Sequence, residues 1–140
     1  MSRVFWDTNI FIYLFEGQGR LSKEVAALRM RMRLRGDQLL TSTITLGEIL
    51  VKPLEKGDRG LAAKYEAFFT TSSILVPFDV MAALAYASLR ADRTLRPPDT
   101  IQLACAASAG VDLFVTNDSR LHSKQVKGIQ FIVPLDRVPI

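Results

Sequence analysis

The chain has 140 residues, with 18 Lys and Arg against 14 Asp and Glu, one His, one Cys and a net charge of +4. Its length predicts a single domain over residues 1–140 that buries about two-thirds of the surface exposed in the unfolded chain. The hydrophobic content of 49% and the charged content of 23% are typical of a globular protein and argue against disorder.

The segments take the following order along the chain, read from composition, periodicity and the positions of Gly and Pro. In the first half we predict a strand at 3–6, a helix at 10–16, a helix that begins at Ser22 and ends before Gly36, a strand at 39–43, a helix at 45–51 disturbed at Pro53, and a loop at 57–60. The second half predicts a helix at 61–69, a strand at 74–78, a helix at 80–91, a rigid break at 95–98, a helix at 99–109, and strands at 112–115 and 130–133.

Residues 29–35 are the ambiguous segment, because Arg alternates there with Met and Leu. Strict alternation is typical of a strand with one cationic face. Arg, Met and Leu nevertheless favour a helix, and no β-branched residue is present. We predict a helix whose arginines spread around its surface. An RNA-binding ridge stays open as the alternative to a solvated face.

Strands that alternate with helices predict an α/β fold with a mainly parallel central sheet and right-handed crossovers. In such sheets the reactive site lies beyond the carboxyl ends of the strands. The excess of positive charge is compatible with a polyanionic partner, since Lys and Arg bind phosphates, but charge alone leaves that partner open.

Cysteine and hydropathy exclude further classes. Cys105 is the only cysteine, which excludes an internal disulfide and a Cys-based zinc site, and its apolar neighbours predict a core position. The longest apolar run, residues 80–87, is far shorter than the ~18 residues of a membrane span. Asp7 interrupts the N-terminal apolar segment, which argues against a secretory signal. We therefore expect a soluble, cytoplasmic protein with no membrane partner.

Four acidic residues stand at strand ends or helix starts. Asp7 follows the first strand and Asp118 follows the strand at 112–115, so both should project from one edge of the sheet. Asp99 opens a helix after two prolines, and taken alone it is interpreted as an N-cap. Glu48 begins an otherwise apolar helix, and taken alone it is interpreted as a solvated helix residue.

Together these acids predict a negatively charged pocket on a basic protein. Clustered carboxylates raise one another's pKa unless a cation joins them. Ligands that are all oxygen favour Mg²⁺ or Mn²⁺ over zinc. One or two such ions can activate water and stabilise the leaving oxygen of a phosphodiester. A phosphodiester substrate would also explain the basic exterior.

Four short motifs carry a family resemblance: residues 5–10 (FWDTNI), 44–50 (ITLGEIL), 98–104 (PDTIQLA) and 114–118 (FVTND). In this order they resemble the four motifs of the PIN-domain family. More narrowly, the chain is similar to VapC-type toxins of bacterial toxin–antitoxin pairs. No single motif would suffice, but the ordered set spans nearly the whole chain.

The resemblance implies a three-layer α/β/α sandwich and a Mg²⁺- or Mn²⁺-dependent endoribonuclease. It implies that the acids Asp7, Glu48, Asp99 and Asp118 form the active site. Of these, Asp7, Asp99 and Asp118 would bind metal and Glu48 would orient or deprotonate the attacking water. Hydrogen bonds from Thr8, Asn9 and Thr116 would support them.

The resemblance also implies partners, namely an RNA substrate, a VapB-like antitoxin and a second copy of the chain in a homodimer. Phe11, Tyr13, Leu14 and Phe15, near the first motif, belong either to the core or to an antitoxin groove, and we favour the core with one or two exposed. Departures from the family are small. Trp6 is bulky and should pack in the core.

Three other functions are alternatives to a metal-dependent ribonuclease. A phospho-acceptor domain needs an acidic pair near the first strand, where only Asp7 stands. A haloacid-dehalogenase-type phosphatase needs a second Asp two residues after Asp7, where Asn9 stands. A catalytically silent PIN-like module that binds RNA or protein stays open, although no acid is missing. His122, after the fourth motif, is interpreted as a surface residue rather than a general acid.

Overall fold

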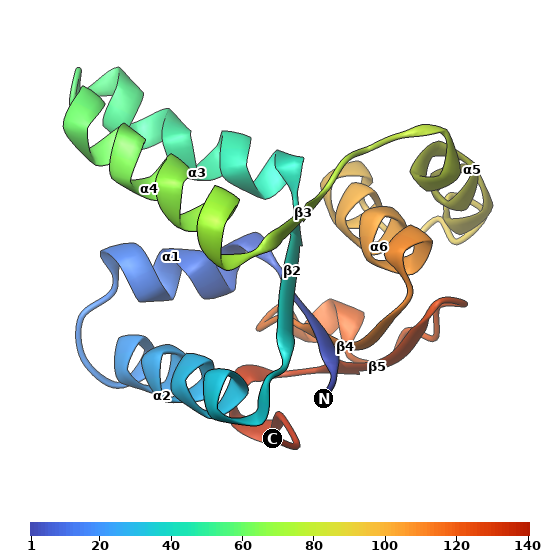
Figure 1. Ribbon diagram of the computed structural model, residues 1–140. Coiled ribbons are helices and arrows are strands. Elements are labelled where there is room, and N and C mark those ends of the chain that lie inside the picture. Colours follow the sequence, from blue (N-terminus) through green and yellow to red (C-terminus); the bar gives the residue numbers. More distant parts are fainter.

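The computed structural model describes residues 1–140 and consists of a five-stranded sheet between helices (Figure 1). The strands are β1 (Arg3–Trp6), β2 (Gln38–Ser42), β3 (Ile74–Val76), β4 (Val111–Val115) and β5 (Ile129–Val133). The helices are α1 (Thr8–Glu16), α2 (Arg20–Arg35), α3 (Thr43–Glu55), α4 (Arg59–Ser72), α5 (Val80–Leu89) and α6 (Pro97–Ala109). Short 3-10 turns follow at Ser119–Leu121 and Leu135–Arg137.

All neighbouring strands pair in parallel, in the order β3-β2-β1-β4-β5. Strand β1 therefore lies at the centre, between β2 and β4. Helices cover both faces of the sheet, which confirms the α/β/α sandwich expected from the sequence. Because every strand runs the same way, the carboxyl ends of β1, β2 and β4 meet at one edge.

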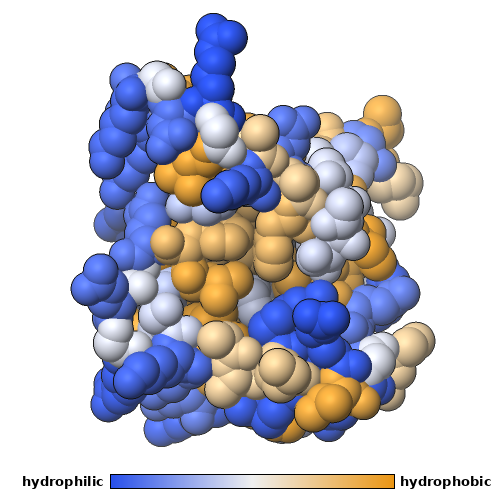
Figure 2. All heavy atoms as spheres, turned by 60° about the vertical axis from the view of Figure 1, so that its left-hand side comes forward, coloured by the Kyte–Doolittle hydropathy of each residue, from blue (hydrophilic) through white to orange (hydrophobic).

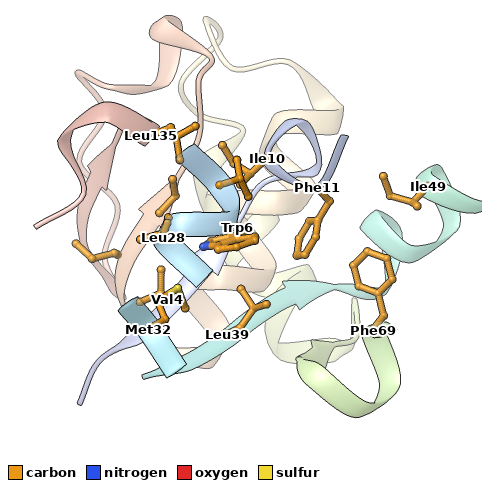
Figure 3. Close-up of a cluster of buried hydrophobic side chains, with 13 residues drawn as sticks. Val4, Trp6, Ile10, Phe11, Leu28, Met32, Leu39, Ile49, Phe69 and Leu135 are labelled. Atoms are coloured by element: carbon orange, nitrogen blue, oxygen red, sulfur yellow. The ribbon is translucent and has the colours of Figure 1, made fainter. Parts of the chain in front are cut away.

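Two hydrophobic clusters hold the layers together, one on each face of the sheet. On the face covered by α1 and α2, Trp6 is fully buried, as predicted, and lies between Leu28 and Phe11 (Figure 3). On the face covered by α5 and α6, the rings of Phe5 and Phe114 stack at 5.2 Å. Both cores thus contain side chains from the central strand β1, whose alternating residues point to opposite faces.

The predicted elements agree with the observed ones to within two residues, apart from the two helices on either side of Gly57. Helix α3 continues through Pro53 to Glu55, although a disturbance at Pro53 was expected. Pro53 is buried, and packing of α3 against α4 compensates for the backbone hydrogen bond that proline cannot donate. The predicted loop at 57–60 was wrong in its second half. Helix α4 begins at Arg59 because the Asp58 carboxylate accepts the Leu61 N–H at 3.0 Å.

Helix α6 begins at Pro97, two residues earlier than predicted. Proline is tolerated in the first turn, where its missing N–H has no partner in any case. Asp99 is therefore the third residue of the helix and not its N-cap, which is Arg96. The interpretation of Asp99 as a simple capping residue is wrong, and its carboxylate is not used to bind the helix backbone.

The segment 29–35 is helical, as predicted. Three of its arginines bind other parts of the chain: Arg29 donates to the Ser72 carbonyl at 3.2 Å, Arg31 to the Ile140 carbonyl at 3.0 Å, and Arg35 pairs with Asp37 at 3.0 Å. These guanidinium groups bind the protein itself, at three separate positions of the chain, which argues against one continuous RNA-binding ridge. None of the six α-helices combines the length and the hydropathy that a membrane span requires.

Two phenylalanines on the neighbouring strands β4 and β5, one buried and one exposed, provide a test of the core. Phe114→Ala should lower the free energy of unfolding by about 3–5 kcal/mol, because it removes a fully buried ring. The matched variant Phe131→Ala, on β5, should cost less than about 1 kcal/mol, since that ring is 64% exposed. Urea denaturation measures both values, and equal losses would contradict the assignment of Phe114 to the core.

Candidate active site

Asp7 is a buried carboxylate at the carboxyl end of β1, where only 9% of the residue is exposed. One of its oxygens accepts the Thr8 backbone N–H at 2.8 Å, as the N-cap of α1, and the other accepts the Thr116 hydroxyl at 2.8 Å. Burial raises the pKa of Asp7 to about 6, and these two hydrogen bonds oppose the rise. The negative charges of Asp99 and Glu48 raise this pKa further, so the three acids share one electrostatic environment.

Thr116 connects the ends of β1 and β4. Its buried hydroxyl donates to Asp7 and accepts the Asp118 backbone N–H at 3.1 Å and the Asn9 side-chain amide at 3.3 Å. Its carbonyl lies 2.7 Å from Nε2 of His122, which is half-buried and acts as a donor there. The side chain of Asp7 is therefore held in one orientation by the Thr8 N–H at the start of α1 and by the Thr116 hydroxyl directly after β4.

Glu48 projects from α3 as an exposed side chain. The Thr8 hydroxyl donates to its Oε1 at 3.3 Å. Thr8 in turn accepts the Nε2 amide of Gln102 at 2.9 Å, and this amide also donates to Thr45 at 2.7 Å. The Ser42 hydroxyl donates to Oε1 of Gln102 at 2.5 Å. A buried glutamine on α6 thus ties α1, β2 and α3 together beneath Glu48.

The sequence did not predict a role for Gln102, Ser42 or Thr45. The sequence feature that could have indicated Gln102 is its position within the otherwise apolar segment 101–106 of a helix, since a buried amide needs hydrogen-bond partners. Those partners lie 60, 57 and 94 residues away along the chain, so sequence alone does not identify them.

Asp118 and Asp99 share a cation, Arg120. The Nε of Arg120 donates to Oδ1 of Asp118 at 2.9 Å, its Nη2 donates to the other oxygen, and the same Nη2 lies 3.6 Å from Oδ2 of Asp99. These hydrogen bonds lower the pKa of Asp118. The pKa of Asp99 is raised, first by burial and then by the charge of Asp118. The sequence did not predict this role of Arg120 either.

The four predicted acids therefore lie at one edge of the sheet but in two different settings. Asp7 is buried without an adjacent cation, and Glu48 is exposed next to Thr8. Asp99 and Asp118 are paired through Arg120. The electrostatic coupling forms a chain from Glu48 through Asp7 and Asp99 to Asp118.

The donor set fits a hard divalent cation, since the acids offer only oxygen and the inner carboxylate lacks a positive partner. No three His, Cys, Asp or Glu side chains are gathered closely enough to enclose a metal ion. An open arrangement of this kind suits Mg²⁺, which keeps several of its waters and takes one or two carboxylates. At this spacing one or two of Asp7, Asp99 and Asp118, rather than all three together, could contact such an ion, with waters completing its coordination.

Fold and site together define an α/β protein with an acidic centre at the carboxyl edge of a parallel sheet. The model of the PIN domain family matches residues 4–127, and the chain belongs to this family. Among curated proteins, none matches the chain significantly.

Several solved structures share the fold. A DNA-bound VapBC complex from Salmonella typhimurium matches with a TM-score of 0.73 and 21% identity, covering 96% of this chain and 99% of that chain. FitAcB from Neisseria gonorrhoeae matches with a TM-score of 0.72, 19% identity and coverage of 96% and 99%. VapBC-1 from nontypeable Haemophilus influenzae matches with a TM-score of 0.72 and 18% identity, covering 96% of this chain and 99% of that chain. At these identities the likeness establishes the fold.

The setting of Asp7 predicts a pH dependence of stability. The folded state raises the pKa of Asp7 from 3.8 to about 6, so the contribution of Asp7 to stability falls as pH rises between these values, by roughly 3 kcal/mol in total. Asp7→Asn removes this loss and should be more stable than wild type above pH 6. Urea denaturation in excess EDTA from about pH 4 to pH 8 measures the difference.

The control is Asp136→Asn, at an exposed residue whose side chain makes no hydrogen bond or ion pair. Its stability should follow that of the wild type at every pH. A constant difference between Asp7→Asn and wild type over the whole range would show that Asp7 carries no burial penalty.

Proposed function

We propose that this chain is an endoribonuclease that hydrolyses RNA phosphodiester bonds with Mg²⁺ or Mn²⁺ as cofactor, and that residues 1–140 act as a single PIN domain. The observation that carries the proposal is the gathering of Asp7, Glu48, Asp99 and Asp118 at one edge of the sheet. The motif order and the family support it. A net charge of +4 despite this acidic edge leaves positive charge for the phosphates of the substrate.

In this proposal the metal ligands come from Asp7, Asp99 and Asp118. A bound Mg²⁺ or Mn²⁺ supplies Lewis-acid stabilisation of the reacting phosphate and a water of lowered pKa. Thr116 and the Thr8 N–H fix the orientation of the Asp7 oxygens, and Asn9 positions Thr116.

Glu48 orients the attacking water or accepts its proton. Two features suit it to this role. It is exposed, so water reaches it, and the Thr8 hydroxyl holds one of its oxygens at 3.3 Å. Through Thr8 and Gln102 its position depends on α6, the helix that carries Asp99. Glu48, the proton acceptor, is thereby linked through hydrogen bonds to the helix that carries Asp99, one of the metal ligands.

We further propose that the chain is the toxin of a VapBC-type pair, which acts in the cytoplasm and is neutralised by a VapB-like antitoxin. The similar solved structures include VapBC complexes. The side of the molecule formed by α1 to α4 carries an apolar area bordered by hydrophilic side chains (Figure 2). An area of this kind is typical of a protein-binding surface.

The four residues named near the first motif belong to the core: Phe11 is fully buried against Trp6, and Tyr13, Leu14 and Phe15 pack partly buried against the same cluster. The expectation that one or two of them are exposed was therefore wrong. Ile12 is 38% exposed on α1, and Val51 and Leu54 are 50% and 57% exposed on α3. These three exposed side chains are candidates for contact with an antitoxin or with a second copy of the chain in a homodimer.

Purified protein should cleave single-stranded RNA when Mg²⁺ or Mn²⁺ is supplied and should be inactive in excess EDTA. Asp7→Asn should lower the cleavage rate by about two orders of magnitude or more, whereas Asp136→Asn should cleave like wild type. Gel analysis and sequencing of RNA ends measure both. Cleavage that persists in excess EDTA would refute metal dependence. RNA that is bound but never cut would favour the catalytically silent module.

Expression in bacterial cells tests the toxin role. Wild-type protein should arrest growth and generate new RNA ends, whereas Asp7→Asn should do neither. Co-expression of a short reading frame adjacent to the gene of this chain should restore growth. Equal growth and unchanged RNA with both proteins would contradict the toxin proposal. The nuclease proposal is tested separately, by the cleavage assay with purified protein.

A further inference from the structure

We propose that Arg120 is an internal counter-cation of the acidic site. In the metal-free protein its guanidinium binds the Asp118 and Asp99 carboxylates. It gives up these carboxylates when a divalent ion binds, and then contacts a phosphate of the RNA. The last step rests on the proposed nuclease function, whereas the first two concern only the protein and a metal ion.

The contacts of Arg120 are specific. It lies two residues after Asp118, in the 3-10 turn Ser119–Leu121, and its backbone N–H donates to Oδ1 of Asp118 at 3.1 Å. Its guanidinium binds both oxygens of the same carboxylate, with Nε at 2.9 Å. Nη2 also lies 3.6 Å from Asp99 on α6. One side chain therefore neutralises acids from two separate segments.

The exposure of these groups permits exchange. The Arg120 side chain is 50% exposed, whereas Asp99 and Asp118 are 22% and 17% exposed. An ion pair open to solvent on the arginine side is weak and is released at little cost. Arg96 also acts on both acids through its charge but forms no ion pair with them. Arg120 is thus the cation in contact with the pair.

A metal ion and the guanidinium require the same oxygens. Arg120 engages both oxygens of Asp118, so an ion bound by Asp118 must displace at least one of these hydrogen bonds. A competing internal state lowers the apparent affinity for the metal by the fraction of molecules that are blocked. Removal of the guanidinium should therefore tighten metal binding, and it leaves Asp99 and Asp118 to repel each other until the metal arrives.

The displaced guanidinium stays beside the site, because its backbone belongs to the turn that holds Asp118. Its planar fork matches the geometry of a phosphate, so it is suited to the RNA backbone once the carboxylates are taken by metal. The same residue thus weakens metal binding and supports substrate binding. These opposite effects distinguish it from a residue that only maintains the fold.

Isothermal titration with Mn²⁺ alone tests the first part, on wild type, Arg120→Gln, Arg120→Lys and the control Arg93→Gln. Arg93 is exposed and makes no ion pair or side-chain hydrogen bond. Arg120→Gln should bind Mn²⁺ roughly three to ten times more tightly, Arg120→Lys should fall between it and wild type, and Arg93→Gln should equal wild type. Unchanged or weaker Mn²⁺ binding by a folded Arg120→Gln would overturn the proposal.

Cleavage at saturating Mn²⁺ tests the second part. Arg120→Gln should show a higher KM for RNA and slower cleavage although its metal site is full, and Arg120→Lys should recover part of the loss. Full activity of Arg120→Gln would refute the phosphate contact. If the wild type cleaves no RNA but Arg120→Gln binds Mn²⁺ more tightly, the nuclease function fails and the counter-cation stands. If the wild type cleaves RNA but Arg120→Gln binds Mn²⁺ no more tightly than wild type, the nuclease function stands and the counter-cation proposal fails.

Discussion

The burial of the Asp7 carboxylate is the constraint on which the site depends. A carboxylate removed from water needs hydrogen bonds or a cation, and Asp7 has two hydrogen bonds but no adjacent cation. Strand β1 must therefore lie beside β4, where Thr116 supplies its hydroxyl, and must lead directly into α1, where Thr8 supplies its N–H. The central position of β1 in the sheet satisfies both requirements.

The sequence predicted most of the fold and the position of all four acids at one edge. Regular alternation of apolar strands and helices was sufficient for the layers, and parallel pairing brings Asp7 and Asp118 together. The prediction of helix boundaries was wrong where tertiary packing outweighs local sequence preferences. Pro53 was expected to disturb its helix, but α3, packed against α4, continues through Pro53 to Glu55. Asp99 has the local features of an N-cap, yet α6 begins two residues earlier, at Pro97.

The contacts that complete the site were beyond the reach of sequence. Gln102 is linked to Ser42, Thr45 and Thr8 across distances of 57 to 94 residues, which only the folded sheet brings together. Arg120 is close to Asp118 in the chain, but its reach to Asp99 depends on how α6 packs against β2 and β4. Residue type indicates which groups need partners, whereas the partners are defined by the tertiary structure.

The buried amide of Gln102 also has a mechanical consequence. It is bonded to groups on α1, β2 and α3 at once, so α6 cannot slide along the sheet without breaking several hydrogen bonds in a water-poor interior. Asp99 belongs to α6 and Glu48 belongs to α3, so these hydrogen bonds link the two helices that carry the two acids. Asp118, at the start of the 3-10 turn Ser119–Leu121, makes no hydrogen bond with Gln102 or with its three partners.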